Sequence, residues 1–180
     1  VSTLIAERFP ATLELALVAG LIALGLGIPL GVYAALRRGK ASAQLVMTGT
    51  LFGVSLPNFV VGIVLIWIFA VELKWLPSFG RGEVVAFGSW TSGLLTRDGL
   101  LHLILPAFTL SAFQLTLIMR LVRAEMLEVL RTDYIRFARA RGLTDRSVYF
   151  GHALKNTLVP VITITGLQLG SLIAFAIITE

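Results

Sequence analysis

Long apolar runs alternate with short polar stretches along this chain. The apolar runs cover residues 11–36, 45–71, 100–119 and 158–179. As helices that rise about 1.5 Å per residue, all four are long enough to cross a hydrocarbon layer about 30 Å thick. The first run contains one charge, Glu14, and the second contains none. The pattern therefore predicts four transmembrane helices in an all-α, polytopic membrane bundle.

Details within these runs refine the prediction. Gly20, Gly25, Gly27 and Gly31 would let neighbouring helices approach the first run closely. Glu14 lies within a turn of the membrane boundary, so we expect solvation there in preference to a role in an ion pathway. In the second run, Ser55 and Asn58 flank Pro57, which removes a backbone donor. On the residues alone, interhelical hydrogen bonds are favoured over substrate contacts for Ser55 and Asn58.

Basic residues predict the orientation of the helices. Arg37, Arg38 and Lys40 follow the first run, and residues 120–157 carry eight of the fifteen Lys and Arg residues. Basic loops are retained on the cytoplasmic side of a membrane. Residues 72–99 have nearly balanced charges and are rich in Gly and Ser, so we expect them outside, with Trp75 and Trp90 as interfacial anchors.

Composition supports a membrane protein. The 180 residues are 57% hydrophobic, with a mean hydropathy of +0.90, whereas soluble domains are about 45–50% apolar. The net charge of +5 lies largely in the 120–157 stretch and reports topology, not nucleic-acid binding. The sequence has no cysteine, which excludes disulfides and thiolate metal sites within it.

The 120–157 stretch has internal order that topology alone does not require. Leu127, Leu130, Tyr134 and Phe137 recur at helical spacing and predict one apolar helix face. Gly142 lies where a helix end needs a left-handed residue. The stretch is therefore predicted to fold as helix, glycine turn and helix.

Smaller signals accompany this pattern. Asp133 with Arg136, and Glu128 with Arg131, are oppositely charged pairs three residues apart that would support a helix. Thr144 or Asp145 would cap the helix after the turn. The alternative is a basic loop without any partner, kept inside only by its charge.

Residues 133–143 read DYIRFARARGL, followed by HALKN at 152–156 and LVP at 158–160. This sequence resembles the cytoplasmic EAA loop of permease subunits from binding-protein-dependent ABC importers, in their dipeptide/oligopeptide and nickel branch. Of the general EAA motif, only Ala138, Gly142 and Leu154 fit. Arg136 and Phe137 replace its first two residues, while Lys155 stands in place of its proline, a pattern that suits the peptide branch.

The resemblance extends over nearly the whole chain and implies a fold and a set of sites. It implies a type I ABC importer permease domain over residues 1–180, with four of six expected transmembrane helices present and 120–157 as the ATPase-docking loop. The implied docking residues are Asp133, Tyr134, Phe137, Ala138, Ala140, Gly142, His152 and Asn156. It places the second run on the translocation path, where Ser55, Pro57, Asn58 and Gln168 are the candidate residues.

The resemblance also implies the partners and the function. The expected partners are a second permease subunit, two ABC ATPase subunits, an extracytoplasmic solute-binding protein and membrane lipid, in a bacterial or archaeal inner membrane. The expected function is ATP-driven import of di- or oligopeptides, with nickel or another small solute as the alternative. Identity of the solute is not encoded in these motifs.

Other classes of function have weaker support. An intramembrane serine protease would need Ser55 and His102, but the residues around Ser55 lack the second glycine of a nucleophile turn. An ion-coupled transporter would need buried charges, and only Glu14 is available. The absence of a P-loop predicts no ATP hydrolysis by the chain itself. Two histidines on opposite predicted sides do not predict a metal site, and we expect neither cofactor nor enzymatic activity.

Overall fold

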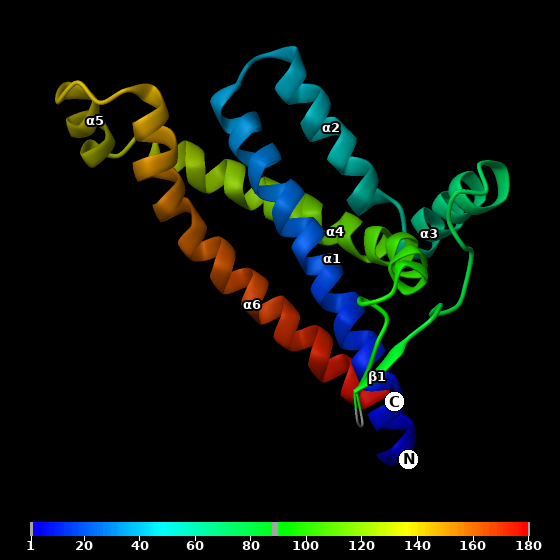
Figure 1. Cartoon of the computed structure of the whole chain (residues 1–180). Helices are drawn as coiled ribbons and strands as arrows, with labels where there is room; N and C mark the ends of the chain where they lie inside the picture. The colour runs from blue at the N-terminus through cyan, green and yellow to red at the C-terminus, as the bar shows by residue number, and fades with distance from the viewer. Residues whose placement is uncertain (1, 88–89, 180) are drawn as a thin grey trace.

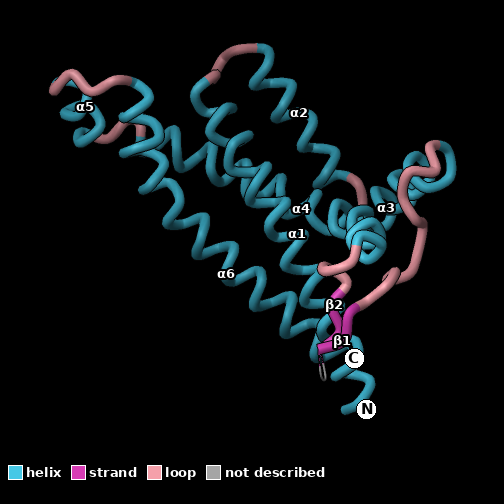
Figure 2. The backbone as a smooth tube through the Cα atoms, in the orientation of Figure 1, coloured by secondary structure: helices cyan, strands magenta, loops and turns pink. Residues whose placement is uncertain are grey.

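The computed structural model describes the backbone of residues 2–87 and 90–179. Side chains at 2–8, 52–54, 87–90, 169 and 171–179 lie outside the described set, including Trp90, a predicted interfacial anchor. Helices dominate the described part of the chain, and Figure 2 shows them joined by loops, the longest of which covers residues 73–84 and leads into a small hairpin.

Three long helices form the body of the molecule. They are α1 (Ser2–Leu36), α4 (Arg97–Val129) and α6 (Leu154–Thr179). Helix α4 is central, because it packs most extensively against α1 and also contacts α2, α3 and α6. In Figure 1 the turn after α1 lies at the same end as the short helix α5, whereas the hairpin and both termini lie at the opposite end.

Glycines allow α1 and α4 to approach closely. A Cβ atom on Gly31 would lie 2.7 Å from the carbonyl oxygen of Met119 and from Cβ of Val122. Gly27, one turn earlier, faces Ile118 in the same way. Because lipid tails are as apolar as the helices, such backbone contact is a main source of helix association in a membrane. The prediction of close packing is confirmed at these two glycines, whereas Gly25 has no neighbour within 4 Å.

Two of the predicted spans are confirmed as long apolar helices, by length and composition. Residues Phe9–Leu36 and Arg97–Val129 are each long and apolar enough to cross a membrane. Helix α6 covers the fourth predicted run with 26 residues. Large apolar side chains such as Leu21 and Leu167 are exposed on these helices, as expected where a helix meets lipid or a neighbouring membrane helix.

The second predicted span was wrong as a single helix. It is divided into α2 (Ala41–Ser55) and α3 (Asn58–Ile66), followed by the π-helical segment η1 (Trp67–Glu72). Pro57 causes the break: it has no N–H to donate, and it adopts φ −57° and ψ 141°, which is extended and not helical. At 15 residues, α2 would reach only about 22 Å, less than the hydrocarbon thickness.

The polar stretch after η1 also departs from an all-α fold. It contains the two-stranded antiparallel hairpin of β1 (Val85–Phe87) and β2 (Trp90–Ser92), with Val85 opposite Ser92. Helix α4 then begins at Arg97, where the Thr96 hydroxyl accepts a hydrogen bond from the Gly99 N–H at 3.0 Å. Strand β2 packs against α1, so the hairpin belongs to the same body as the helices.

Candidate functional site

The first part of the 120–157 stretch differs from its predicted structure. Helix α4 continues ten residues beyond Met119, and the chain then breaks at residues 130–132 before α5 (Asp133–Ala140) begins. Leu127 and Tyr134 therefore lie on different helices, and the predicted continuous apolar face was wrong. In α5 the buried positions are Ile135 and Ala138, whereas Tyr134 and Phe137 are exposed.

Helix α5 is held down by its buried side. Ile135 and Ala138 join a hydrophobic cluster with Val148 and Ala153 of the π-helical segment η2 (Ser147–Ala153) and with Met126 of α4. Since Ala138 is 6% exposed, it packs beneath the surface instead of forming part of it. The buried side thus leaves the opposite side of α5 free to face outward.

The turn between α5 and η2 confirms the prediction for Gly142. Its φ is +79°, in the left-handed region that glycine adopts without strain. The Gly142 N–H donates to the Arg139 carbonyl at 2.9 Å, and the Leu143 N–H donates to the Ala138 carbonyl at 3.4 Å. These two bonds form a Schellman motif, which satisfies carbonyl groups at the end of α5. A Cβ atom at Gly142 would meet nothing within 4 Å, so the backbone alone requires glycine there.

The next helix begins with the predicted cap. The Thr144 hydroxyl accepts from the Ser147 N–H at 3.4 Å, and the Thr144 carbonyl accepts from the Val148 N–H at 3.0 Å. This is the geometry of an N-cap residue. Helical turns then run through η2 into α6, confirming the order of helix, glycine turn and helix.

Three of the predicted docking residues are joined by hydrogen bonds. The Asn156 side-chain amide donates to the Tyr134 hydroxyl at 2.7 Å, and that hydroxyl donates to the His152 carbonyl at 3.4 Å. This chain of bonds ties α5 to η2 and to the start of α6. We call residues 133–156 the knob; in Figure 1 α5 lies at the end of the molecule away from the termini.

Exposed aromatic rings and arginines share the surface of the knob. Phe137 is 63% exposed and Phe150 is 52% exposed. The Arg141 guanidinium lies 5.6 Å from the centre of the Phe137 ring, and Arg139 lies 5.9 Å from the centre of the Tyr149 ring. Such cation–π contacts contribute about 0.5–1 kcal/mol at exposed sites. Phe150 was not among the docking residues predicted from the sequence, although a large apolar residue inside a polar loop was an available signal.

The remaining predicted docking residues have simpler surroundings. Asp133 is exposed and pairs with Arg136 at 3.2 Å, which confirms that predicted ion pair. Glu128 and Arg131, both described, form no ion pair, so the second predicted pair was wrong. Ala140 is exposed at the end of α5. The docking role of these residues stays a prediction.

Gln168 lies apart from the other three candidate path residues. Ser55, Pro57 and Asn58 surround the α2–α3 break with exposed side chains, and in the described part of the structure neither Ser55 nor Asn58 has a side-chain hydrogen bond. Gln168 is half-buried on α6. In the view of Figure 1, α1 and α4 lie between α6 and α3. The interhelical hydrogen bonds that the residues alone favoured at Ser55 and Asn58 are therefore not found among the described residues.

Glu14 has a different environment from the one predicted. Its side chain is only 3% exposed, and its Oε2 atom accepts a hydrogen bond from the Gly93 N–H at 3.2 Å. The carboxylate thus fastens the segment after β2 to α1, instead of being solvated. The sequence signal was a single charge in an apolar run, but its partner is 79 residues away.

The same end of the molecule has further polar contacts. The Glu83 N–H donates to Oδ2 of Asp98 at 2.9 Å, and the Thr96 hydroxyl bonds the Glu83 carbonyl. Asp98 also lies 3.6 Å from Nδ1 of His102. Within the described residues, no group of three His, Asp or Glu side chains is placed to hold a metal ion.

Comparison with known proteins gives a consistent result. Residues 27–180 match the family described as "Binding-protein-dependent transport system inner membrane component". The chain is 46% identical over 184 residues to the di/tripeptide transport system permease protein DppB of Pseudomonas aeruginosa, covering 96% of this chain and 55% of that protein.

Other relatives agree. The chain is 40% identical to the dipeptide transport system permease protein DppB of Escherichia coli K12, over 96% of this chain and 56% of that protein. It is also 40% identical to the oligopeptide transport system permease protein AppB of Bacillus subtilis, over 100% of this chain and 55% of that protein. The chain thus spans about half the length of the curated relatives it matches.

Proposed function

The chain belongs to the family of binding-protein-dependent transport system inner membrane components, and on that premise we propose that it forms part of a peptide-importing permease. Residues 1–180 would be a single membrane domain of the type I ABC importer kind, with four of six transmembrane segments. One of the four, α2 with α3, is a broken helix. The three relatives described above are named for peptide transport, which favours peptides over nickel as the solute.

The knob is the observation that carries this proposal. Its buried side packs on α4, while its outer side presents Phe137, Phe150 and flanking arginines. A compact helical projection with exposed aromatic and Arg residues is suited to dock in a groove, since these residue types dominate binding energy at interfaces. We infer that the groove belongs to an ABC ATPase subunit, and that a basic loop without a partner would not need this order.

The knob would transmit ATPase movement to the membrane helices as a rigid body. Helix α4 runs from the hairpin end to the three-residue break before the knob, and α6 leaves the knob directly. Hydrogen bonds among Tyr134, His152 and Asn156 connect α5 to α6. Packed elements of this kind move together when a domain rotates.

The path and the remaining partners follow from the same proposal. Ser55, Pro57, Asn58 and Gln168 would face the translocation path once a second permease subunit completes it. The hairpin end would face the extracytoplasmic binding protein. The chain would supply no catalytic activity of its own, because ATP hydrolysis would occur in the ATPase subunits.

Reconstitution tests the function. The full-length protein that contains this chain would be placed in liposomes with its second permease, ATPase subunits and binding protein, and uptake of a radiolabelled dipeptide would be measured. We expect uptake to require ATP and binding protein, and to continue when a protonophore removes the ion gradient. Uptake that follows the gradient without ATP would instead identify an ion-coupled transporter.

A further inference from the structure

A hollow of about 500 Å³ lies where α1 and α4 reach the knob end of the molecule. Its lining residues are Arg38, Arg123, Ala124, Leu127, Glu128 and Arg131. Arg123, Leu127 and Arg131 follow one another at intervals of four, which places them along one side of α4 and the turn after it. Arg38 comes from the turn that follows α1.

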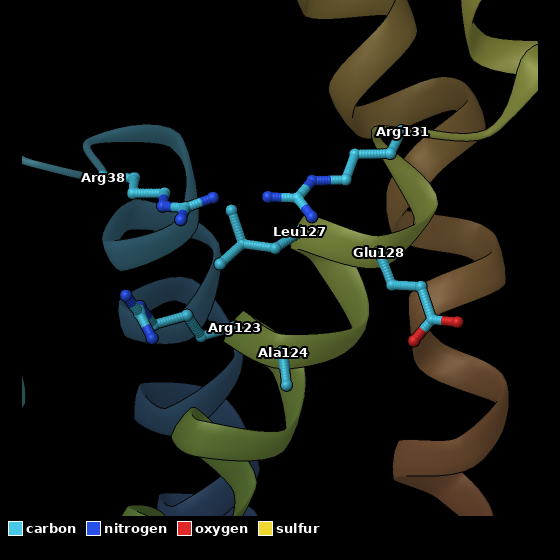
Figure 3. A pocket seen from close by; sticks show the side chains of 6 residues that line it. All are labelled: Arg38, Arg123, Ala124, Leu127, Glu128 and Arg131. Carbon is cyan, nitrogen blue, oxygen red and sulfur yellow. The ribbon is translucent and has the colours of Figure 1, made fainter.

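Three arginines line this hollow, and two of them face each other across it. Figure 3 shows the guanidinium groups of Arg38 and Arg131 facing one another across Leu127, while the Arg123 side chain extends along α1 below Arg38. The Glu128 carboxylate points away from all three. The hollow therefore gathers three positive charges around an apolar wall formed by Leu127 and Ala124.

These charges are not compensated within the described residues. None of the three guanidinium groups forms an ion pair or a hydrogen bond there, although Arg136 nearby does pair with Asp133. The Nε atom of Arg123 is buried without a partner. A buried donor that lacks an acceptor is unfavourable, and it adds to the uncompensated positive charge that a bound anion would neutralise.

We propose that this hollow binds the phosphate group of an anionic phospholipid from the cytoplasmic leaflet. Guanidinium groups match phosphate oxygens with paired, charge-assisted hydrogen bonds. On the topology proposed above, the hollow lies just past Leu36, where α1 leaves the membrane and lipid phosphates are found. A free phosphate ion would leave the apolar wall and much of the volume unused, which favours a lipid over an ion. Lipid binding in the hollow would not require the knob to dock an ATPase subunit.

Lipid retention by the purified transporter that contains this chain tests the proposal. Native mass spectrometry would compare binding of phosphatidylglycerol, an anionic phosphodiester, with binding of zwitterionic phosphatidylcholine. The variant Arg123→Gln with Arg131→Gln is expected to bind phosphatidylglycerol about thirtyfold more weakly, the loss that corresponds to two basic contacts of about 1 kcal/mol each. Arg136→Gln with Arg146→Gln removes the same charge from exposed positions outside the hollow, and is expected to leave binding unchanged.

A second variant avoids any effect on helix folding. Arg38→Gln lies beyond the end of α1, and we expect it to weaken phosphatidylglycerol binding by about fivefold. Millimolar inorganic phosphate is expected not to displace the lipid. Displacement by phosphate would identify a site for a soluble anion and overturn the proposal. Equal losses in the hollow and control variants, or equal binding of both lipids, would also overturn it. If the hollow variants keep lipid binding but no longer bind an ATPase subunit, the hollow is a protein-binding site and the proposal is overturned.

Discussion

The hairpin end and the knob end of this molecule are held in place by different kinds of contact. At the hairpin end, the Glu14 side chain accepts a hydrogen bond from the backbone of Gly93, which is 79 residues away. At the knob end, the path of the chain follows from local rules: a Schellman turn at Gly142 and an N-cap at Thr144. The difference teaches that the turns of the knob are locally specified, whereas the position of the hairpin depends on the assembled helices.

The two ends also differ in what they present. At the hairpin end, the carboxylates of Glu14 and Asp98 accept hydrogen bonds from the backbone. The knob uses its buried apolar side internally and leaves aromatic and basic groups outside. A locally specified element with an exposed binding surface is suited to keep its shape when a partner pushes on it.

The largest expected effect concerns the side of the membrane on which each end lies. Single cysteines would be introduced by Ser42→Cys, Ser78→Cys and Asp145→Cys, since the chain has no cysteine of its own. We expect an impermeant thiol reagent, added to sealed right-side-out cells, to label only position 78, because basic loops stay inside. Labelling at 42 or 145 in intact cells would reverse the assignment of the two ends.

The next largest effect is expected from a substitution in the glycine turn of the knob. Gly142→Val would place a β-branched residue at φ +79°, at a strain of about 1–3 kcal/mol. A Cβ there meets no neighbour, so strain and not collision would act. We expect association with the ATPase subunit, measured by surface plasmon resonance, to weaken by about tenfold to hundredfold.

Two glycine substitutions act as matched controls for this experiment. Gly142→Asn is expected to keep most of the binding, because asparagine tolerates the left-handed region better than valine. Gly151→Ala lies in the same knob, and its Cβ would meet only the Ser147 hydroxyl at 3.7 Å, so binding is expected to stay unchanged. If Gly142→Val binds as well as the unmodified chain, the turn is not needed for docking.

A third, smaller effect is expected when the Glu14–Gly93 hydrogen bond at the hairpin end is removed. Glu14→Ala leaves the Gly93 N–H without its acceptor, which costs about 1–3 kcal/mol for a buried donor. We expect hydrogen exchange of the Gly93 amide to accelerate by about fivefold to hundredfold. Glu14→Gln keeps an acceptor oxygen and is expected to lose less. Glu128→Ala removes an exposed carboxylate at the other end and is the control. Equal exchange of the Gly93 amide in all three variants would show that Glu14 does not hold Gly93 in place.

The smallest effect tests the polar link within the knob. Asn156→Ala and Tyr134→Phe each remove the 2.7 Å hydrogen bond between these residues, and each is expected to destabilise the packing of α5 by about 0.5–1.5 kcal/mol. Exchange of α5 amides would report the change. Because both variants remove the same bond, the double variant is expected to be no worse than the stronger single one. Full additivity would show that the two residues act separately.

Features that depend on short-range rules could be predicted from the sequence, whereas contacts between distant residues could not. The first and third apolar runs, the positive φ of Gly142 and the Thr144 cap rest on short-range rules, and all are confirmed. The break at 130–132 was missed because helical spacing continues across it in Leu127, Leu130, Tyr134 and Phe137. The break at Pro57 had a sequence signal, but the signal did not distinguish a kink from a new helix.

The partners of distant residues could not be predicted. Nothing near Glu14 indicates Gly93, and the β1–β2 pairing depends on how α1 and α4 place the intervening chain. The proximity of Arg38 to Arg123 and Arg131 likewise depends on the packing of α1 against α4. The candidate path residues lie in two separate apolar runs, and their shared role in one path stays a prediction.

Site-specific photo-crosslinking from the two ends is the most direct test of the claim that the knob docks an ATPase. A photoreactive phenylalanine analogue would replace Phe137 in the knob or Phe79 near the hairpin, which are 63% and 86% exposed. In the assembled transporter, we predict an adduct with an ABC ATPase subunit from position 137 and none from position 79. No ATPase adduct from position 137 in a complex that still transports peptide, or equal adducts from both positions, would contradict the account.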